Sequence, residues 1–221
     1  RAQPPLCRRQ RQMCIRDRMS TSWRGRKEPT AGELLLVNWV LVLLRGIPVA
    51  IVVFGGLILH TVLRIFEYPF LGSRRPLTQY VTQVVCKTSL FLLGISITVE
   101  GFPMKERGAV VANHSSWLDI FALNATQKIY FVAKSEVANW PGIGWLARAT
   151  GTVFIQRKAL QAHKQKNIFT ERLLAGHKLL FFPEGTSTDS LRVLPFKSSL
   201  FAAFFETNVP VSYTHLTLPT T

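Results

Sequence analysis

The sequence predicts an α/β domain in which a mixed sheet is flanked by helices, preceded by one or more hydrophobic helices that associate with a membrane. Two observations lead to this fold class. Residues 34–63 are predominantly apolar, with Arg45 as their one charged side chain. From residue 96 onward, short apolar stretches alternate with amphipathic ones, which is typical of a sheet covered by helices.

The N-terminal apolar region is long enough for a membrane helix. Residues 46–63 are eighteen consecutive positions without a charged side chain, close to the roughly 20 that span a bilayer. A single helix from about Leu34 would span it, whereas a pair of helices broken near Gly46 and Pro48 would lie in the interface. A buried core helix is the third alternative. The bias that orients a span is weak, because basic residues flank both sides: Arg24, Arg26, Lys27, Arg64, Arg74 and Arg75.

The two ends of the chain differ from the rest. Residues 1–18 hold six Arg and one Asp without periodicity, and Met19 after them reads as a natural start. Parts of both ends resemble translated sequencing-adaptor text. We therefore expect a non-native leader at 1–18 and a non-native tail at 212–221. Between them we expect a basic, hydrophobic membrane-associated region at 19–95 and the α/β domain at 96–211. A genuine basic arm is the alternative interpretation of the leader.

The chain carries a net charge of +15 and stays strongly basic without its first eighteen residues. Such a charge favours anionic partners, namely nucleic acid, an anionic membrane surface or a phosphorylated substrate. Lys and Arg are spread along the chain and the aromatic residues lie in apolar runs, so we expect no nucleic-acid partner. Cys7, Cys14 and Cys86 have no disulfide or metal-ligand spacing, which favours a reducing compartment and predicts no metal site.

The elements of the α/β region can be assigned in order. Short apolar strands are expected between helices with one apolar face, and Ser135 and Ser198 are suitable helix caps. The expected strands are 97–100, 109–112, 129–133, 152–155 and 179–182. The expected helices are 117–126, 136–149 with a break around Pro141, 162–174 and 198–206.

A His and a carboxylate follow the second expected strand. Residues 113–119 read Asn-His-Ser-Ser-Trp-Leu-Asp. Within a regular helix, His114 and Asp119 would point about 140° apart, so His114 must lie in the turn before the helix for the carboxylate to reach its ring. A carboxylate on one ring nitrogen leaves the other free as a general base. The alternative is an ordinary polar strand-to-helix turn.

A second polar turn follows the last expected strand. Residues 180–187 read Leu-Phe-Phe-Pro-Glu-Gly-Thr-Ser, where α/β proteins place ligand groups. With residues 113–119 and with 151–157 (Gly-Thr-Val-Phe-Ile-Gln-Arg), this segment resembles three signature blocks of the lysophospholipid acyltransferase family, the 1-acyl-sn-glycerol-3-phosphate acyltransferases and their relatives. The resemblance extends over residues 100–211 in the family's order and implies a glycerolipid acyltransferase fold. Further similar segments are 131–136 and 194–197.

The resemblance implies a role for each matching residue. His114 would take the proton of an acceptor hydroxyl, and Asp119 would orient the ring. The acceptor oxygen would attack a thioester without an acyl-enzyme, and backbone amides near Gly185 or at the helix start after His114 would stabilise the oxyanion. The residues implied to line the acceptor site are Arg157, Glu184, Gly185 and Thr186, with Lys134, Arg192 and Lys197 as further contacts to anions. For Lys134 and Arg192 a solvated basic face is the alternative.

The resemblance also implies the substrates. The donor would be acyl-CoA or acyl-carrier protein, the acceptor a lysolipid such as 1-acyl-sn-glycerol-3-phosphate, and no cofactor would be needed. Many relatives that acylate this phosphate lipid have Arg after Glu-Gly-Thr, where this chain has Ser187. Residues 187–190 resemble instead the lyso-ornithine lipid acyltransferases, and Asp189 would then meet an ammonium group. The expected location is a bacterial inner membrane, with the site at its cytoplasmic face.

Residues 208–211 resemble the start of a fourth family block, directly before the expected tail. We therefore expect the native protein to continue beyond Val211, and the chain without that continuation to be unstable or inactive. Two other classes fit less well. A non-catalytic lipid-binding protein with this fold would be expected to lack His114 or Asp119. A hydrolase would need a nucleophilic Ser in a Gly-x-Ser-x-Gly turn, which the sequence does not contain.

Overall fold

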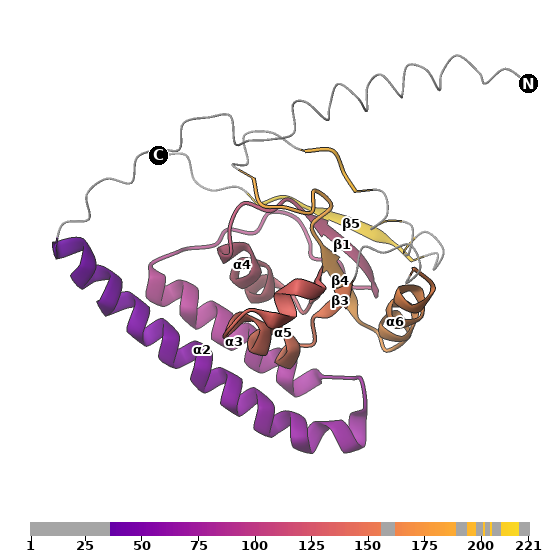
Figure 1. The fold of residues 1–221 in the computed structure, drawn as a ribbon, viewed down its shortest axis with the longest axis horizontal. Helices are drawn as coiled ribbons and strands as arrows, with labels where there is room; N and C mark the ends of the chain where they lie inside the picture. The colour runs from indigo at the N-terminus through magenta and orange to yellow at the C-terminus, as the bar shows by residue number, and fades with distance from the viewer. Residues whose placement is uncertain are drawn as a thin grey trace, which may run out of the picture.

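The structure, a computed structural model, describes residues 36–155, 162–188, 194–197, 201, 204 and 209–216. A parallel sheet lies at its centre with helices on both faces, and a long helical hairpin covers the outside of one helical layer (Figure 1). The α/β class with flanking helices and a preceding hydrophobic helix is therefore confirmed.

The hairpin consists of α2 (Leu36–Leu71) and α3 (Pro76–Leu93), which pack on each other. On its inner side α3 packs on α4 (Leu118–Thr126), and α2 contacts α5 (Ile143–Ala149). These two short helices separate the hairpin from the sheet (Figure 1). The remaining helical elements are the 3-10 helix η2 (Ser135–Asn139) and α6 (Ala162–Leu174), which covers the other face of the sheet.

The sheet has five strands in the order β3-β2-β4-β1-β5. All pairings among the described residues are parallel, so this part of the sheet is more regular than the mixed sheet that we expected. In the register, Ala109 lies opposite Leu179 on one side and Val211 on the other. The strands are β1 (Gly108–Ala112), β2 (Tyr130–Lys134), β3 (Val153–Ile155), β4 (Lys178–Phe181) and β5 (Val211–Thr214).

Both faces of the sheet are buried. Ala109 and Val111 of β1 belong to the core that includes Phe169 and Leu173 of α6. The alternate residues of β1, Val110 and Ala112, share a second core with Leu123 of α4. A parallel sheet covered on both faces needs strands without polar positions, which explains the continuous apolar sequence of β1.

One expected strand is absent. Residues 97–100 form no strand, and Ile97 and Val99 are exposed. Their alternation of apolar and polar residues suits a strand, but a strand also needs a partner strand to bond with, and none of the described strands pairs with this segment. The other four expected strands are confirmed to within about a residue at each end.

Three of the four expected helices are confirmed, including the break around Pro141 that separates η2 from α5. The fourth, 198–206, and its expected cap Ser198 lie almost wholly outside the described residues. Ser135 is not a cap, because it is the first residue of η2 and no side-chain hydrogen bond caps that helix. Its hydroxyl donates to Glu136 instead.

The edge strand β5 includes residues that we expected to belong to a non-native tail. Val211–Thr214 pairs with β1, and the side chain of Asn113 donates to the Leu216 carbonyl (2.9 Å) and accepts from the Leu216 amide (2.7 Å). The expected leader, residues 1–18, lies outside the described residues. Strand pairing uses backbone groups that any sequence supplies, so the proposed domain boundaries stay a prediction.

The helix α2 is apolar and exposed. Its segment Asn38–Leu71 is long and apolar enough to cross a membrane. Only 6% of the residues in its most apolar stretch are buried within the protein. The helix runs unbroken through Gly46 and Pro48, so the pair of broken helices is wrong, and its exposure is incompatible with a buried core helix. An apolar surface of this extent suits a lipid environment.

A polar joint fixes the hairpin turn and ties it to the α/β domain. The buried carboxylate of Glu67 accepts hydrogen bonds from the Leu77 amide (2.9 Å) and the Thr78 hydroxyl (2.7 Å), at the start of α3. Arg64 pairs with Glu67 at 3.7 Å and donates to the Gly72 and Arg74 carbonyls. Arg75 donates to the Ala149 carbonyl at 2.7 Å, which connects the turn to the end of α5.

We predict that Glu67→Ala destabilises the protein, because it removes the acceptor of two hydrogen bonds and the partner of Arg64. A loss of about 2 kcal/mol corresponds to a fall of about 4–8 °C in the melting temperature of a chain of this size. Circular dichroism at 222 nm in detergent micelles measures this fall. Glu106→Ala, at an exposed loop position, is the control, and equal melting temperatures for the two variants would contradict the prediction.

Candidate active site

The turn between β1 and α4 holds a histidine and a carboxylate in contact. The Nδ1 atom of His114 lies 2.8 Å from Oδ2 of Asp119. His114 is in the turn and Asp119 in the first turn of α4, which is the arrangement that the five-residue spacing required. Ser116 Oγ accepts from the Leu118 amide at 3.0 Å and so supports the start of the helix.

Backbone amides hold the Asp119 carboxylate in place. Oδ2 accepts from the amides of Ser115 (2.7 Å) and Ser116 (2.9 Å), and Oδ1 accepts from the Ser115 hydroxyl (3.1 Å). Burial by itself would raise the pKa of Asp119, but the hydrogen bonds from His114, Ser116 and Ser115 outweigh it and hold the pKa below its ordinary value. The carboxylate is therefore ionised at neutral pH.

An ionised carboxylate at Nδ1 fixes the tautomer of His114. Because the carboxylate can only accept, Nδ1 carries the proton and Nε2 keeps a free electron pair. The imidazole stacks on Phe182 with ring centroids 4.0 Å apart and an interplanar angle of 13°. Its side chain is 19% exposed, so the ring is oriented from two sides and still reachable by a substrate.

A cavity of about 820 Å³ begins at His114 and extends between the sheet and the helical layer. Its volume lies in the range of ligand pockets in proteins. Lys134, Gly185, Thr186 and Ser187 line it at the carboxyl ends of β2 and β4, the same end of the sheet as His114, and Lys134 is its one Lys or Arg among the described residues. Most of the remaining lining is apolar: Val53, Gly56 and Leu57 of α2, Val81, Val85 and Cys86 of α3, Val137 of η2, Trp140 between η2 and α5, and Ile143 and Leu146 of α5.

The cavity has a polar end on the side away from His114. His114 lies just after the carboxyl end of β1 and Lys134 is the last residue of β2, whereas Asn124 and Thr150 precede the opposite ends of β2 and β3. Because the strands are parallel, these two groups of residues lie at opposite ends of the strands. With a rise of about 3.3 Å per residue, a strand of five residues separates the two ends by roughly 17 Å.

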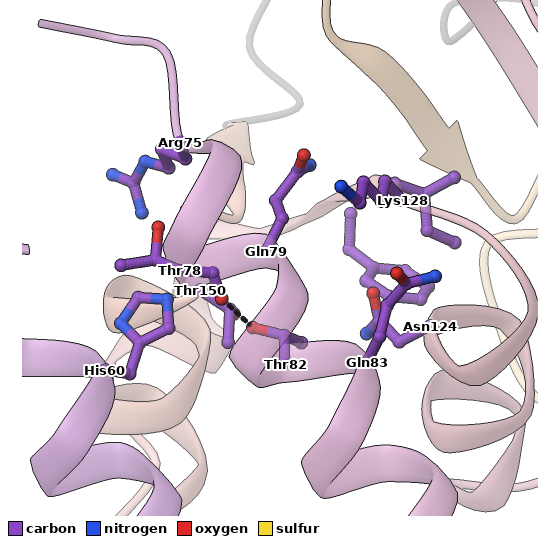
Figure 2. A pocket seen from close by; sticks show the side chains of 11 residues that line it. His60, Arg75, Thr78, Gln79, Thr82, Gln83, Asn124, Lys128 and Thr150 are labelled. Carbon is purple, nitrogen blue, oxygen red and sulfur yellow. Dashed lines mark hydrogen bonds between the residues drawn. The ribbon is translucent and has the colours of Figure 1, made fainter. Parts of the chain in front are cut away.

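A second cavity, of about 10 Å³, adjoins this polar end (Figure 2). His60, Thr82, Asn124 and Thr150 line both cavities. The space suits about one water molecule. Nδ1 of His60 and Nε of Arg75 are buried here without a hydrogen-bond partner among the described residues. Gln79, Gln83 and Lys128 complete the polar lining that Figure 2 shows.

The structure brings together some of the predicted site residues and separates others. His114, Lys134, Gly185 and Thr186 line the large cavity, and Asp119 lies behind His114. Glu184 and Lys197 are not among the lining residues. Glu184 is buried and accepts a hydrogen bond from the Leu194 amide, and Lys197 has an exposed side chain. Arg157, Asp189 and Arg192 lie outside the described residues.

Three of the amides in the segments that we expected to stabilise an oxyanion make other hydrogen bonds. The Gly185 amide donates to the Phe182 carbonyl at 3.0 Å, and the Ser115 and Ser116 amides donate to Asp119. An N–H group has one proton to donate, so these amides are not free for a substrate oxygen. The side-chain donors that line the cavity include the Lys134 ammonium and the hydroxyls of Thr186 and Ser187, of which the Thr186 hydroxyl makes a long bond (3.5 Å) to the Ser187 carbonyl.

Two contributors to the site were missed in the sequence. Phe182 supports the His114 ring, and its place directly before Pro-Glu-Gly-Thr was the available signal. The hairpin residues that wall the cavity, such as Gly56 and Val85, gave no signal of their own because they belong to an apolar run. In the part of the chain that the structure describes, no group of three His, Cys, Asp or Glu side chains could hold a metal ion.

Comparison with known proteins identifies the family. A sequence model described as "Acyltransferase" matches residues 96–213, more than half of the chain. The chain belongs to the acyltransferase family. Among solved structures, this acyltransferase-family chain is similar to the 1-acyl-sn-glycerophosphate acyltransferase of Thermotoga maritima, with a TM-score of 0.59, 25% identity, and coverage of 80% of this chain and 72% of the other.

Curated relatives of the acyltransferase-family chain carry two kinds of name. The lyso-ornithine lipid O-acyltransferases of Rhodobacter capsulatus and Rhizobium meliloti are 52% and 38% identical to it over 83% and 76% of its length. The 1-acyl-sn-glycerol-3-phosphate acyltransferase of Neisseria gonorrhoeae is 38% identical over 57%. The chain spans 66%, 56% and 50% of the lengths of these three relatives.

We predict that Asp119 contributes acid-sensitive stability. Because its folded-state pKa lies below the ordinary value near 3.8, the contribution is complete above that value and is lost as the pH falls through the lower, folded-state pKa. The difference in melting temperature between the natural protein and Asp119→Asn should therefore shrink from pH 5 to pH 2.5. Thermal unfolding in detergent micelles measures it, and a constant difference would contradict the depressed pKa.

Proposed function

We propose that the protein transfers a fatty acyl group from a thioester to the free hydroxyl of a lysolipid. The observation that carries the proposal is His114, paired with Asp119, in the lining of a large and mostly apolar cavity of an acyltransferase-family chain. The pair supplies a general base, and the cavity suits a hydrocarbon chain. Acyl transfer between sulfur and oxygen involves no change of oxidation state, so the reaction calls for no redox cofactor.

In the proposed reaction, Nε2 of His114 takes the proton of the acceptor hydroxyl as the oxygen attacks the thioester carbonyl. The Asp119 carboxylate stabilises the imidazolium that forms. The tetrahedral oxyanion collapses, the carbon–sulfur bond breaks, and the thiolate takes the proton from His114. Ser115 is an unsuitable nucleophile because its hydroxyl donates to Asp119.

The cavity lining assigns the parts of the substrates. The apolar walls between the sheet, α4, α5 and the hairpin would hold a fatty acyl chain, because burial of each methylene contributes about 0.8 kcal/mol. Lys134 and Thr186, which line the cavity with His114, would donate to the carbonyl oxygen as it becomes negative. The donor would be a thioester of CoA or acyl-carrier protein.

For the acceptor, the sequence of the turn after β4 favours a lyso-ornithine lipid. Ser187 lines the cavity where many relatives acting on lysophosphatidic acid have Arg, and an acceptor without a phosphate needs no such cation. Relatives named lyso-ornithine lipid O-acyltransferases support this choice. Lysophosphatidic acid is the second candidate, because Lys134 provides one cation at the site.

The proposed location is a bacterial inner membrane, with the hairpin in contact with lipid. The exposed apolar surface of α2 supports membrane attachment. A site that uses cytosolic acyl thioesters would face the cytoplasm. Residues of α2 and α3 also form part of the cavity wall, so a lysolipid could reach His114 from the bilayer without crossing water.

We predict that His114→Ala lowers acyl transfer by about 10²–10⁴-fold, because it removes the base. Membranes that contain the longest natural form of the protein are supplied with a labelled acyl thioester and with either lyso-ornithine lipid or lysophosphatidic acid. Product formed from lyso-ornithine lipid and lost in the variant supports the proposal. Use of the phosphate lipid alone would contradict the acceptor assignment, and no product from any lysolipid would favour a non-catalytic lipid-binding protein.

We also predict that the polar end of the cavity limits acyl-chain length, because a longer chain must displace water from polar groups. His60→Leu should raise kcat/KM for a thioester two carbons longer than the preferred one, relative to kcat/KM for the preferred thioester. The increase is up to about tenfold, which is the binding free energy of two buried methylenes expressed as a ratio of rates. His60→Asn keeps a polar group and serves as the matched control. An unchanged chain-length profile in His60→Leu would contradict this account.

A further inference from the structure

The turn after β4 carries the cavity-lining hydroxyls of the site. Gly185 has a φ of 70°, in the left-handed region that favours glycine, and its amide donates to the Phe182 carbonyl. Farther along the turn, the Thr188 amide donates to the His114 carbonyl at 2.8 Å. The intervening Thr186 and Ser187 line the cavity. The position of these two residues therefore depends on how the turn is held.

Glu184 closes this turn at its base. Its side chain is buried, with the residue 3% exposed, and Oε2 accepts a hydrogen bond from the Leu194 amide at 2.8 Å. Beside it, the Pro183 carbonyl accepts from the Lys197 amide at 2.8 Å. The two bonds join residues 183–184 to residues 194–197. A carboxylate acceptor makes the first of them a charge-assisted bond, which is stronger than a bond between neutral groups.

The carboxylate of Glu184 does not line the cavity, although the three residues after it do. Its Oε2 atom is held by the Leu194 amide, and breaking this bond would leave a backbone N–H without a partner, at a cost that burial increases. We propose that Glu184 is a positioning residue: it holds residues 194–197 against the turn and thereby fixes Thr186 and Ser187 beside His114. The proposal rests on the proposed function of the site and assigns Glu184 no contact with substrate.

The test compares two substitutions at Glu184. Glu184→Gln keeps an oxygen that can accept from the Leu194 amide, whereas Glu184→Ala removes the acceptor. For a positioning residue, Glu184→Ala lowers kcat/KM for the lysolipid by about tenfold or more, because Thr186 loses its position beside the developing oxyanion while the His114–Asp119 pair stays intact. Glu184→Gln stays within about threefold of the natural protein. For a residue that binds a cationic acceptor group, Gln would be as damaging as Ala.

Leu194→Pro provides a second variant, which leaves Glu184 untouched and removes the donor N–H together with the Leu194 side chain. It reproduces the fall in kcat/KM of Glu184→Ala if the hydrogen bond positions the turn. A normal kcat/KM in Leu194→Pro, together with an equal loss in Glu184→Gln and Glu184→Ala, would overturn the proposal. Glu106→Ala, remote from the site and exposed, is the control for removal of a carboxylate.

Amide hydrogen exchange followed by mass spectrometry gives a readout that does not depend on activity. In the full-length protein in detergent, the peptide containing residues 194–197 exchanges at least about tenfold faster in Glu184→Ala and at close to the natural rate in Glu184→Gln. Unchanged exchange in Glu184→Ala would overturn the proposal. If no lysolipid is acylated, the proposed function fails, but the exchange experiment still decides whether Glu184 holds this segment.

Discussion

Four hydrogen bonds converge on the carboxylate of Asp119, and the geometry of the site depends on them. They come from the His114 ring, the Ser115 amide and hydroxyl, and the Ser116 amide. Together they compensate for the burial of a charge, which would otherwise be strongly unfavourable. The same bonds fold the chain between β1 and α4 so that His114 stands outside the helix. The Asp119 carboxylate therefore sets the local backbone structure and the tautomer of His114. Phe182, directly after β4, stacks on the His114 ring and fixes its orientation.

The helical hairpin is both the membrane-associated part of the protein and a wall of the cavity. Gly56 lets α2 and α3 approach closely, since a Cβ atom there would lie 2.4 Å from Cγ2 of Val85. Arg75 then connects the hairpin turn to the end of α5. This joint fixes the hairpin relative to the sheet, and the space between them is apolar along most of its length. Attachment to lipid and binding of a lipid chain are thus functions of the same pair of helices.

Two turns at the carboxyl ends of β1 and β4 make up the polar part of the site. They are tied together by the bond from the Thr188 amide to the His114 carbonyl. Within the second turn, successive residues serve different purposes: Gly185, Thr186 and Ser187 line the cavity, whereas Glu184 faces the segment at 194–197. A polar signature in one short segment therefore contains both groups that can meet a substrate and a group that shapes the turn.

The sequence by itself determined the order of the main strands and helices, the apolar helix before them and the pairing of His114 with Asp119, because each leaves a local pattern: apolar runs, a break at Pro141, a five-residue spacing. It failed where the outcome depends on distant segments. Residues 97–100 alternate like a strand but form none, and the hydrogen bond from the Leu194 amide to Glu184 has no signal in the sequence. Only the tertiary structure decided which polar side chains face the cavity, since contacts between segments far apart in the chain leave no periodicity in either one.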